Sequence, residues 1–166
     1  MKYLILIVVL VALLGAGWFV LSGVKQKQTE PTETVLLYYY DVKRDTDASG
    51  MIKCSRDGLV SIQRTIPASR TNEERIDKTT RLLIDGNLSE DERGFISTEF
   101  PLPGLDLIST DLAKDGTLTL TFSDPQNKTG GGSCRVGILW FQIEATAEQF
   151  PEVKSARFMP EELFQP

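Results

Sequence analysis

The uncharged, strongly apolar run from Tyr3 to Val24 is the sequence feature that most constrains how this chain folds. As a helix it would span about 33 Å at about 1.5 Å per residue, which is enough to cross a hydrocarbon core of roughly 30 Å. The run therefore predicts a single transmembrane anchor over residues 1–24 that is kept in the mature protein.

A cleaved signal peptide is one alternative, and a buried soluble helix is another. The apolar region of a signal peptide is typically about 7 to 15 residues long and ends in a small-x-small site. Here Trp18 and Phe19 continue the apolar run beyond Gly15–Gly17. A lipoprotein would need a cysteine directly after the run, but the first cysteine is Cys54.

The charges that flank the run lie on both sides, with Lys2 before it and Lys25 and Lys27 after it. A short, positively charged N-terminal tail usually stays in the cytoplasm, and a long following domain is translocated largely regardless of its own charge. We therefore expect a single-pass protein of the cell membrane whose C-terminal domain is extracytoplasmic.

The composition excludes several classes of function. The chain has 23 acidic and 18 basic residues, so its surface repels nucleic-acid phosphates. It contains no histidine, the commonest general base and a common metal ligand at neutral pH. We expect a non-enzymatic protein without a cofactor, a metal, a small-molecule substrate or a nucleic-acid partner.

The polar segment 25–34 contains Pro31 and reads as a linker, so the domain is expected over residues 35–166. Period-two alternation or β-branched and aromatic composition predicts strands, and an Asp-Gly turn at Asp115-Gly116 predicts a hairpin. The expected strands are Val35–Tyr40, Leu59–Ile66, Leu107–Leu112, Thr117–Ser123 and Val153–Met159.

Two helices are expected from apolar spacing and end signals. Thr71 and Glu74 form a capping-box pattern before a helix over Asn72–Asp85, which ends at Gly86. Ser133 is the expected cap of a second helix, which stops at Pro151. The fold class is therefore α+β: an N-terminal transmembrane helix, then a small mixed β-sheet domain with two main helices packed on it.

A series of short motifs resembles the GerMN domain family of sporulation and spore-germination proteins. The motifs are Leu82-Leu83 before Gly86, the segment Phe100–Gly104, the strand pair around Asp115-Gly116 that ends in Phe122-Ser123, and Phe150–Val153. The stretches Gly131–Val136, Gln142–Thr146, Gln149–Pro151 and Gln165-Pro166 resemble a subgroup from uncultured or candidate-phylum bacteria. Asp85-Gly86-Asn87 stands where the family usually has Gly-Pro.

This resemblance implies a non-enzymatic module of the cell envelope that binds envelope proteins or associates with itself. It also implies a fold similar to domains that pack side by side in ring-shaped envelope machines. Here the domain is present in one copy.

Cys54 and Cys134 are the chain's two cysteines, and outside the cytoplasm two such thiols tend to pair. A disulfide between them would contribute roughly 4 to 5 kcal/mol in the chain-entropy model. Two alternatives stay open: reduced cysteines acting as small core residues, and a reactive Cys134 at a helix N-terminus. A thiol oxidoreductase would require an exposed, adjacent pair.

Two further patterns carry weaker chemistry. The glycines Gly130–Gly132 place backbone N–H groups at a helix start, an arrangement that can bind an anion, but the Lys-Ser/Thr of a P-loop does not follow them and a flexible turn is the better interpretation. The alternative function is a wall-directed hydrolase, in which Asp91-Glu92 with Glu99 or Asp111 would form the carboxylate pair; the other interpretation of these residues is a solvated loop.

Overall fold

The computed structural model of the chain describes residues 30–165. The anchor expected over residues 1–24 and most of the linker expected over residues 25–34 lie outside that range. Within residues 30–165, every helix is too short or too polar to cross a membrane. The first strand begins at Thr32, so the last three residues of the expected linker belong to a strand.

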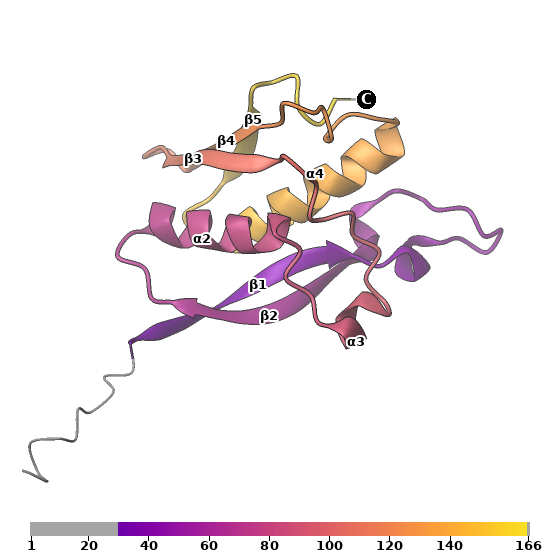
Figure 1. Cartoon of the computed structure of the whole chain (residues 1–166), viewed down its shortest axis with the longest axis horizontal. Helices are drawn as coiled ribbons and strands as arrows, with labels where there is room; N and C mark the ends of the chain where they lie inside the picture. Colours follow the sequence, from indigo (N-terminus) through magenta and orange to yellow (C-terminus); the bar gives the residue numbers. More distant parts are fainter. Residues whose placement is uncertain (1–29, 166) are drawn as a thin grey trace, which may run out of the picture. The chain divides into compact units, whose positions relative to one another are not determined.

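The domain has three layers, with two helices lying between two sheets (Figure 1). The lower sheet in that view consists of β1 (Thr32–Tyr40) and β2 (Leu59–Pro67), which are antiparallel. The helix layer consists of α2 (Asn72–Ile84) and α4 (Ser133–Glu148), each of which contacts both sheets.

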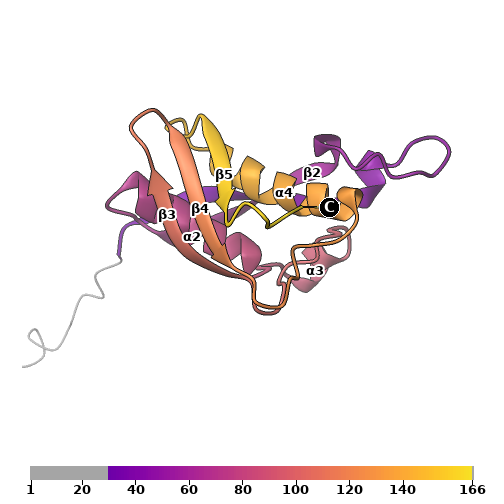
Figure 2. The same ribbon diagram turned by 90° about the horizontal axis from the view of Figure 1, so that it is seen from above.

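The second sheet has the order β3-β4-β5 and lies over the helices (Figure 2). β3 (Asp106–Leu112) and β4 (Thr117–Ser123) form the expected hairpin, in which Gly116 has a φ of +91°. β5 (Ser155–Met159) runs parallel to β4, so this sheet is mixed.

The α+β class and the two main helices are confirmed, but the strands form two sheets rather than one. Both faces of the helix layer are apolar and must be buried. Because one sheet can bury only one face, each face packs against a sheet of its own. The core residues come from all three layers; they include Val35, Leu37, Ile76, Leu83, Leu118, Leu120, Leu139, Ile143 and Phe158.

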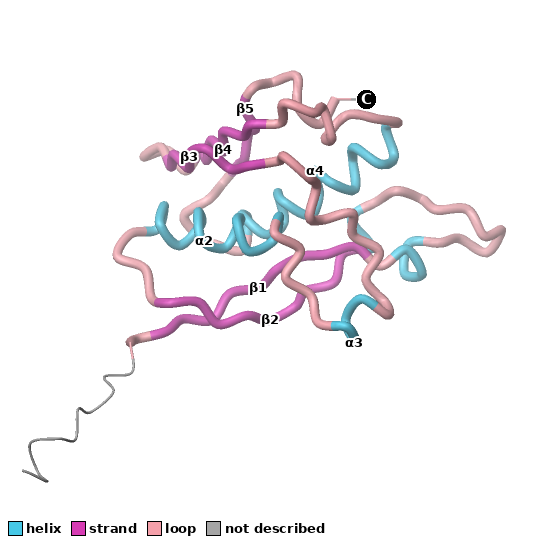
Figure 3. Tube along the Cα trace, viewed as in Figure 1, coloured by secondary structure: helices cyan, strands magenta, loops and turns pink. Residues whose placement is uncertain are grey.

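The helix ends follow the predicted chemistry in part. The Thr71 hydroxyl accepts a hydrogen bond from the Glu74 N–H at 3.1 Å, while the Glu74 carboxylate accepts from the N–H of Arg70 instead of that of Thr71. At α4 the N-cap is Gly132, without a side-chain hydrogen bond, and Ser133 is the first helical residue. A short helix, α3 (Glu90–Arg93), forms where the sequence suggested a loop (Figure 3).

Candidate functional site

The segment 41–58 between β1 and β2, called the arm here, extends from one end of the lower sheet (Figures 1 and 3). At its base, the Asp41 N–H donates to the Gly58 carbonyl at 2.8 Å and continues the β1–β2 pairing. Two short 3-10 helices, Val42–Asp45 and Arg56–Gly58, lie next to this base. The arm is therefore an ordered extension of the hairpin.

A buried carboxylate holds the base of the arm together. Asp45 is 0% exposed, and its oxygens accept hydrogen bonds from the Tyr40 hydroxyl at 2.5 Å and from the Ser55 N–H and hydroxyl, both at 2.6 Å. Burial opposes ionisation of Asp45, but the hydrogen bonds from Ser55 and Tyr40 outweigh it and lower its pKa to about 2. Burial and the same carboxylate raise the pKa of Tyr40.

The tip of the arm is closed by its own polar groups. Thr46 and Ile52 pair across it, and Asp47 accepts hydrogen bonds from Ser49 and from the Met51 N–H at 3.0 Å. The result leaves two large apolar side chains in solvent: Met51 is 67% exposed and Ile52 is 45% exposed. Loops held in place by a rigid scaffold often carry binding residues, which makes the tip of the arm a candidate binding surface.

The arm is fastened to α4 by a disulfide and by ion pairs. Cys54 and Cys134 are bonded across a sequence separation of 80, with their Cα atoms 5.2 Å apart. The guanidinium of Arg56 lies 2.9 Å from the Glu144 carboxylate and 2.6 Å from that of Glu148. These contacts connect the arm to the helix layer and fix its direction relative to the core.

The disulfide lies at the surface, since Cys134 is exposed and Cys54 is half-buried. The fold thus brings the two cysteines together near the surface, and an adjacent, exposed pair is what a thiol oxidoreductase would require. Bonded sulfurs are unavailable as thiolates, and the chain has no histidine to serve as a base for one.

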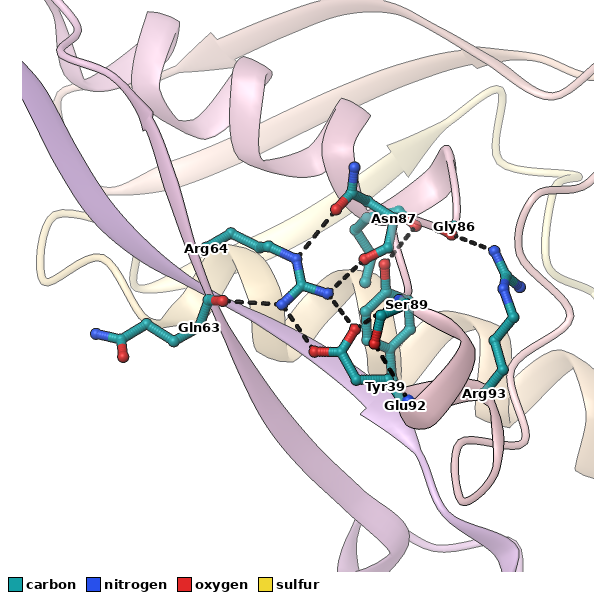
Figure 4. A network of polar contacts seen from close by, with 9 residues as sticks. Tyr39, Gln63, Arg64, Gly86, Asn87, Ser89, Glu92 and Arg93 are labelled. Atoms are coloured by element: carbon teal, nitrogen blue, oxygen red, sulfur yellow. Dashed lines mark hydrogen bonds and ion pairs between the residues drawn. The ribbon is translucent and has the colours of Figure 1, made fainter.

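Glu92, one of the candidate catalytic carboxylates, is held by Arg64 of β2 (Figure 4). Arg64 donates to both oxygens of Glu92, at 2.5 and 3.0 Å, and also to the side chain and carbonyl of Asn87. Hydrogen bonds from Arg64 lower the pKa of Glu92 to about 2, so this carboxylate is ionised and cannot donate a proton near neutral pH. It also accepts the Ser89 N–H at 2.8 Å and thereby caps α3.

A tyrosine lies beside this network on the adjacent strand (Figure 4). The hydroxyl of Tyr39 donates to the Leu83 carbonyl at 3.3 Å, and burial raises its pKa to about 12. Arg64 therefore joins β2 to the segment after α2, while Tyr39 joins β1 to α2, and both contacts have a structural role.

The other acidic candidates are distributed over separate elements. Glu99 forms an ion pair with Arg135 at 2.6 Å, Asp111 accepts from the Ser109 hydroxyl at 2.9 Å on β3, and Asp91 is exposed on α3. Two open hollows on the described domain are lined by other residues: the first by Asn72, Glu73, Leu112, Ala113, Lys114, Gly116, Glu152 and Lys154, the second by Tyr38, Arg56, Leu59, Ala145, Glu148 and Gln149.

The glycine turn before α4 is occupied by an arginine. Arg135 donates to the carbonyls of Gly130 and Lys128, and a Cβ at Gly131 would lie 3.3 Å from the Arg135 side chain. The turn closes around this guanidinium, so the carbonyl groups of the turn, which repel anions, converge there. Over residues 30–165, no cluster of three or more histidine, cysteine or acidic side chains is arranged to hold a metal.

The two cysteines were predictable from the sequence, whereas the arm's buried Asp45 and the Arg64–Glu92 pair were not. Asp45 stands in a polar loop whose sequence has no period, and only the folded chain buries it. Arg64 interrupts the apolar alternation of its strand, and that irregularity was the one available signal.

The comparison with family models agrees with the resemblance. The family model described as Germane, sporulation and spore germination, matches residues 36–162. A crystal structure of a candidate lipoprotein from Clostridium perfringens is similar, with a TM-score of 0.40 and 18% identity over 76% of this chain and 73% of that one. No curated protein matches the chain.

Proposed function

The chain belongs to the Germane family of sporulation and spore germination domains, and we propose that it is a non-catalytic envelope module that binds other proteins through its arm. In this proposal residues 1–24 anchor the chain in the cell membrane as a single pass. The domain then lies outside the cytoplasm and meets its partners there.

The observation that carries this proposal is the preorganised arm. Its base is fixed by the buried Asp45, its side by the disulfide from Cys54 to Cys134, and its tip presents Met51 and Ile52 to solvent. A loop that is rigid before binding loses little conformational entropy on association, so even a small apolar contact contributes to the affinity for a partner. Lys53, next to Ile52, is also exposed and forms an ion pair with Asp57 at 3.3 Å.

The disulfide supports the proposed location, because disulfides persist in oxidising compartments outside the bacterial cytoplasm. The alternative, a wall-directed hydrolase, requires a carboxylic acid with a raised pKa beside a second carboxylate. Glu92 has the opposite property, since Arg64 holds its pKa low.

The test is site-specific photo-cross-linking in intact cells that express the full chain. A photoreactive residue at position 51 should give discrete adducts with extracytoplasmic proteins. The same residue at position 108 on β3, where Ile108 is 59% exposed, is the matched control and should not give them. Equal adducts from both positions, or none from position 51, would contradict binding through the arm.

A further inference from the structure

The two edges of the lower sheet differ, because the outer edge of β1 is closed by other parts of the domain. The Leu36 N–H donates to the Gln149 side-chain oxygen at 2.8 Å, and the Leu36 carbonyl accepts from the Gln149 nitrogen at 2.6 Å. The Tyr38 N–H donates to the Thr146 hydroxyl at 3.0 Å. The Tyr40 carbonyl accepts from the N–H of Ser97 at 2.6 Å.

These bonds fix which backbone groups of β2 point outward. In an antiparallel pair, residues opposite each other direct their N–H and C=O groups either both toward the partner strand or both away from it. Leu36 and Tyr38 point away from β2, so their register partners Gln63 and Ser61 point away from β1. By the same alternation Thr65 also points outward.

The outer edge of β2 is open. The Gln63 carbonyl accepts one hydrogen bond, at 2.9 Å, from the side chain of its neighbour Arg64, which leaves its second lone pair free. No described residue of the chain bonds to the outward N–H or C=O groups of Ser61 and Thr65. Ser61, Gln63 and Thr65 are also exposed.

The middle of β2 has few of the features that usually protect an edge strand from pairing with another chain, because its one proline, Pro67, is the last residue of the strand. Its only charged residue, Arg64, is bound by Glu92, and its register with β1 has no bulge. By contrast, β3 at the edge of the other sheet has a bulge and two exposed aspartates, and β5 is only five residues long. The open edge of β2 is therefore unusual within this domain.

We propose that β2 pairs with β2 of a second copy of this chain, in antiparallel register about a two-fold axis at Gln63. This inference goes beyond the proposed function, in which the module binds other proteins through its arm, and it names one partner. Gln63 would exchange both backbone hydrogen bonds with Gln63 of the second copy, and Ser61 would exchange both with Thr65 of that copy. The result is a continuous four-stranded sheet across the dimer.

The side chains favour this register. It sets amide opposite amide and hydroxyl opposite hydroxyl on the exposed face, and Val60 opposite Ile66 of the second copy on the inner face. Arg64 lies opposite Ile62, so no like charges face each other directly. A two-fold axis at Thr65 would set Gln63 opposite Pro67, which has no N–H to donate. An axis at Ser61 would set Thr65 opposite Asp57, which lies outside the strand.

The register predicts a distinctive cross-linking pattern for single cysteines in the full chain in native membranes. The Cα atoms of two Gln63 residues would be about 5.5 Å apart, within the range of a disulfide. Two Ser61 residues, or two Thr65 residues, would be four positions apart, roughly 13 Å along the strand, which is too far.

Under mild oxidation, Gln63→Cys should give a dimer band at about twice the monomer mass. Ser61→Cys and Thr65→Cys should each give none alone, but a band should appear when the two are expressed together with different tags. Introducing Gln63→Lys into both of these cysteine variants should remove most of the band, because the substitution sets two ammonium groups opposite each other. Thr34→Lys, on the closed strand β1, is the matched charge control and should leave it.

Equal bands from all three single cysteines would overturn the register, since they would report random collision. Absence of a band from Gln63→Cys would overturn the dimer, provided that the variant keeps the Cys54–Cys134 bond and its wild-type unfolding midpoint. Loss of the dimer with retained adducts at position 51 would refute this inference alone. Loss of both would refute the proposed function as well.

Discussion

The hydroxyl of Tyr40, at the end of β1, donates to the buried carboxylate of Asp45 at 2.5 Å, and this contact links the core strand to the base of the arm. Asp45 is 0% exposed, so each hydrogen bond that it accepts replaces one that water would have made. The stability of the arm therefore depends on a tyrosine that belongs to the sheet.

Tyr40→Phe should lower the free energy of unfolding by roughly 1.5 to 3 kcal/mol, because it leaves a buried charged group with one hydrogen bond fewer. Urea unfolding followed by tryptophan fluorescence measures the loss. Tyr38→Phe, at a half-buried position of the same strand, is the control and should change stability by less than about 0.5 kcal/mol. Equal effects at the two positions would argue against the Asp45 contact.

Stability should fall as the pH falls below about 4.5. The pKa values of Asp45 and Glu92 are lowered to about 2 from ordinary values of 3.8 and 4.5. A carboxylate whose pKa is lower in the folded state stabilises that state above its unfolded pKa, and the stabilisation is lost as the pH drops through the folded value. Between about pH 4.5 and 2, the unfolded chain therefore binds more protons.

The measurement is the free energy of unfolding across that pH range for the wild type, Asp45→Asn and Glu92→Gln. Each substitution should lower stability at pH 7 and flatten the pH dependence. A substitution that leaves the slope between pH 4.5 and 2 unchanged would show that the replaced carboxylate keeps an ordinary pKa.

The unreduced protein should contain no free thiols, and reduction should release two. Because the bond closes a loop with a sequence separation of 80, reduction should lower the free energy of unfolding by roughly 4 to 5 kcal/mol in the chain-entropy model. Thiol labelling followed by mass spectrometry, with and without reductant, measures the first result, and urea unfolding the second. Two labelled thiols before reduction would refute the bond in the native protein.

Two glycine substitutions should act in opposite directions. Gly86, at the end of α2, has a φ of +63°, and a Cβ there would lie 2.5 Å from the Phe100 carbonyl oxygen, so Gly86→Ala should cost more than about 1 kcal/mol. Gly137 lies within α4, and a Cβ there would lie 3.7 Å from the Phe141 ring, an ordinary contact.

Gly137→Ala should therefore stabilise the domain by roughly 0.5 to 1 kcal/mol, since alanine favours helix more than glycine does. Thermal and urea unfolding of both variants check the signs. A stabilising Gly86→Ala would show that the segment around Phe100 does not pack tightly on the end of α2.

Local sequence signals predicted the elements better than their assembly. The spacing of apolar residues located α2 and α4, and Asp115-Gly116 located the hairpin, because these signals act within a few residues. The first strand begins at Thr32 instead of Val35, since pairing as far as Pro67 extends it through three polar residues. The alternation of apolar and polar residues shows which side chains share a face of a strand, but not which strands pair with each other. The division into two sheets was therefore not predictable from the sequence.

The candidate site was predictable only where chemistry requires a particular residue type. Cys54 and Cys134 were identifiable because two cysteines admit a single pairing within the chain. The hydrogen bonds of Asp45, and the closure of the Leu36 backbone by Gln149, join residues that are distant in sequence and carry no local pattern.

The helices α2 and α4 are enclosed between the two sheets, and this arrangement separates the parts of the sequence that maintain the fold from those free to diverge. The helix layer tolerates little change on either face. The outer edges of the sheets and the arm face outward. In related chains, a change in the partner that is bound would therefore evolve at these positions, without repacking the interior. Engineering of new specificity should begin at those same positions.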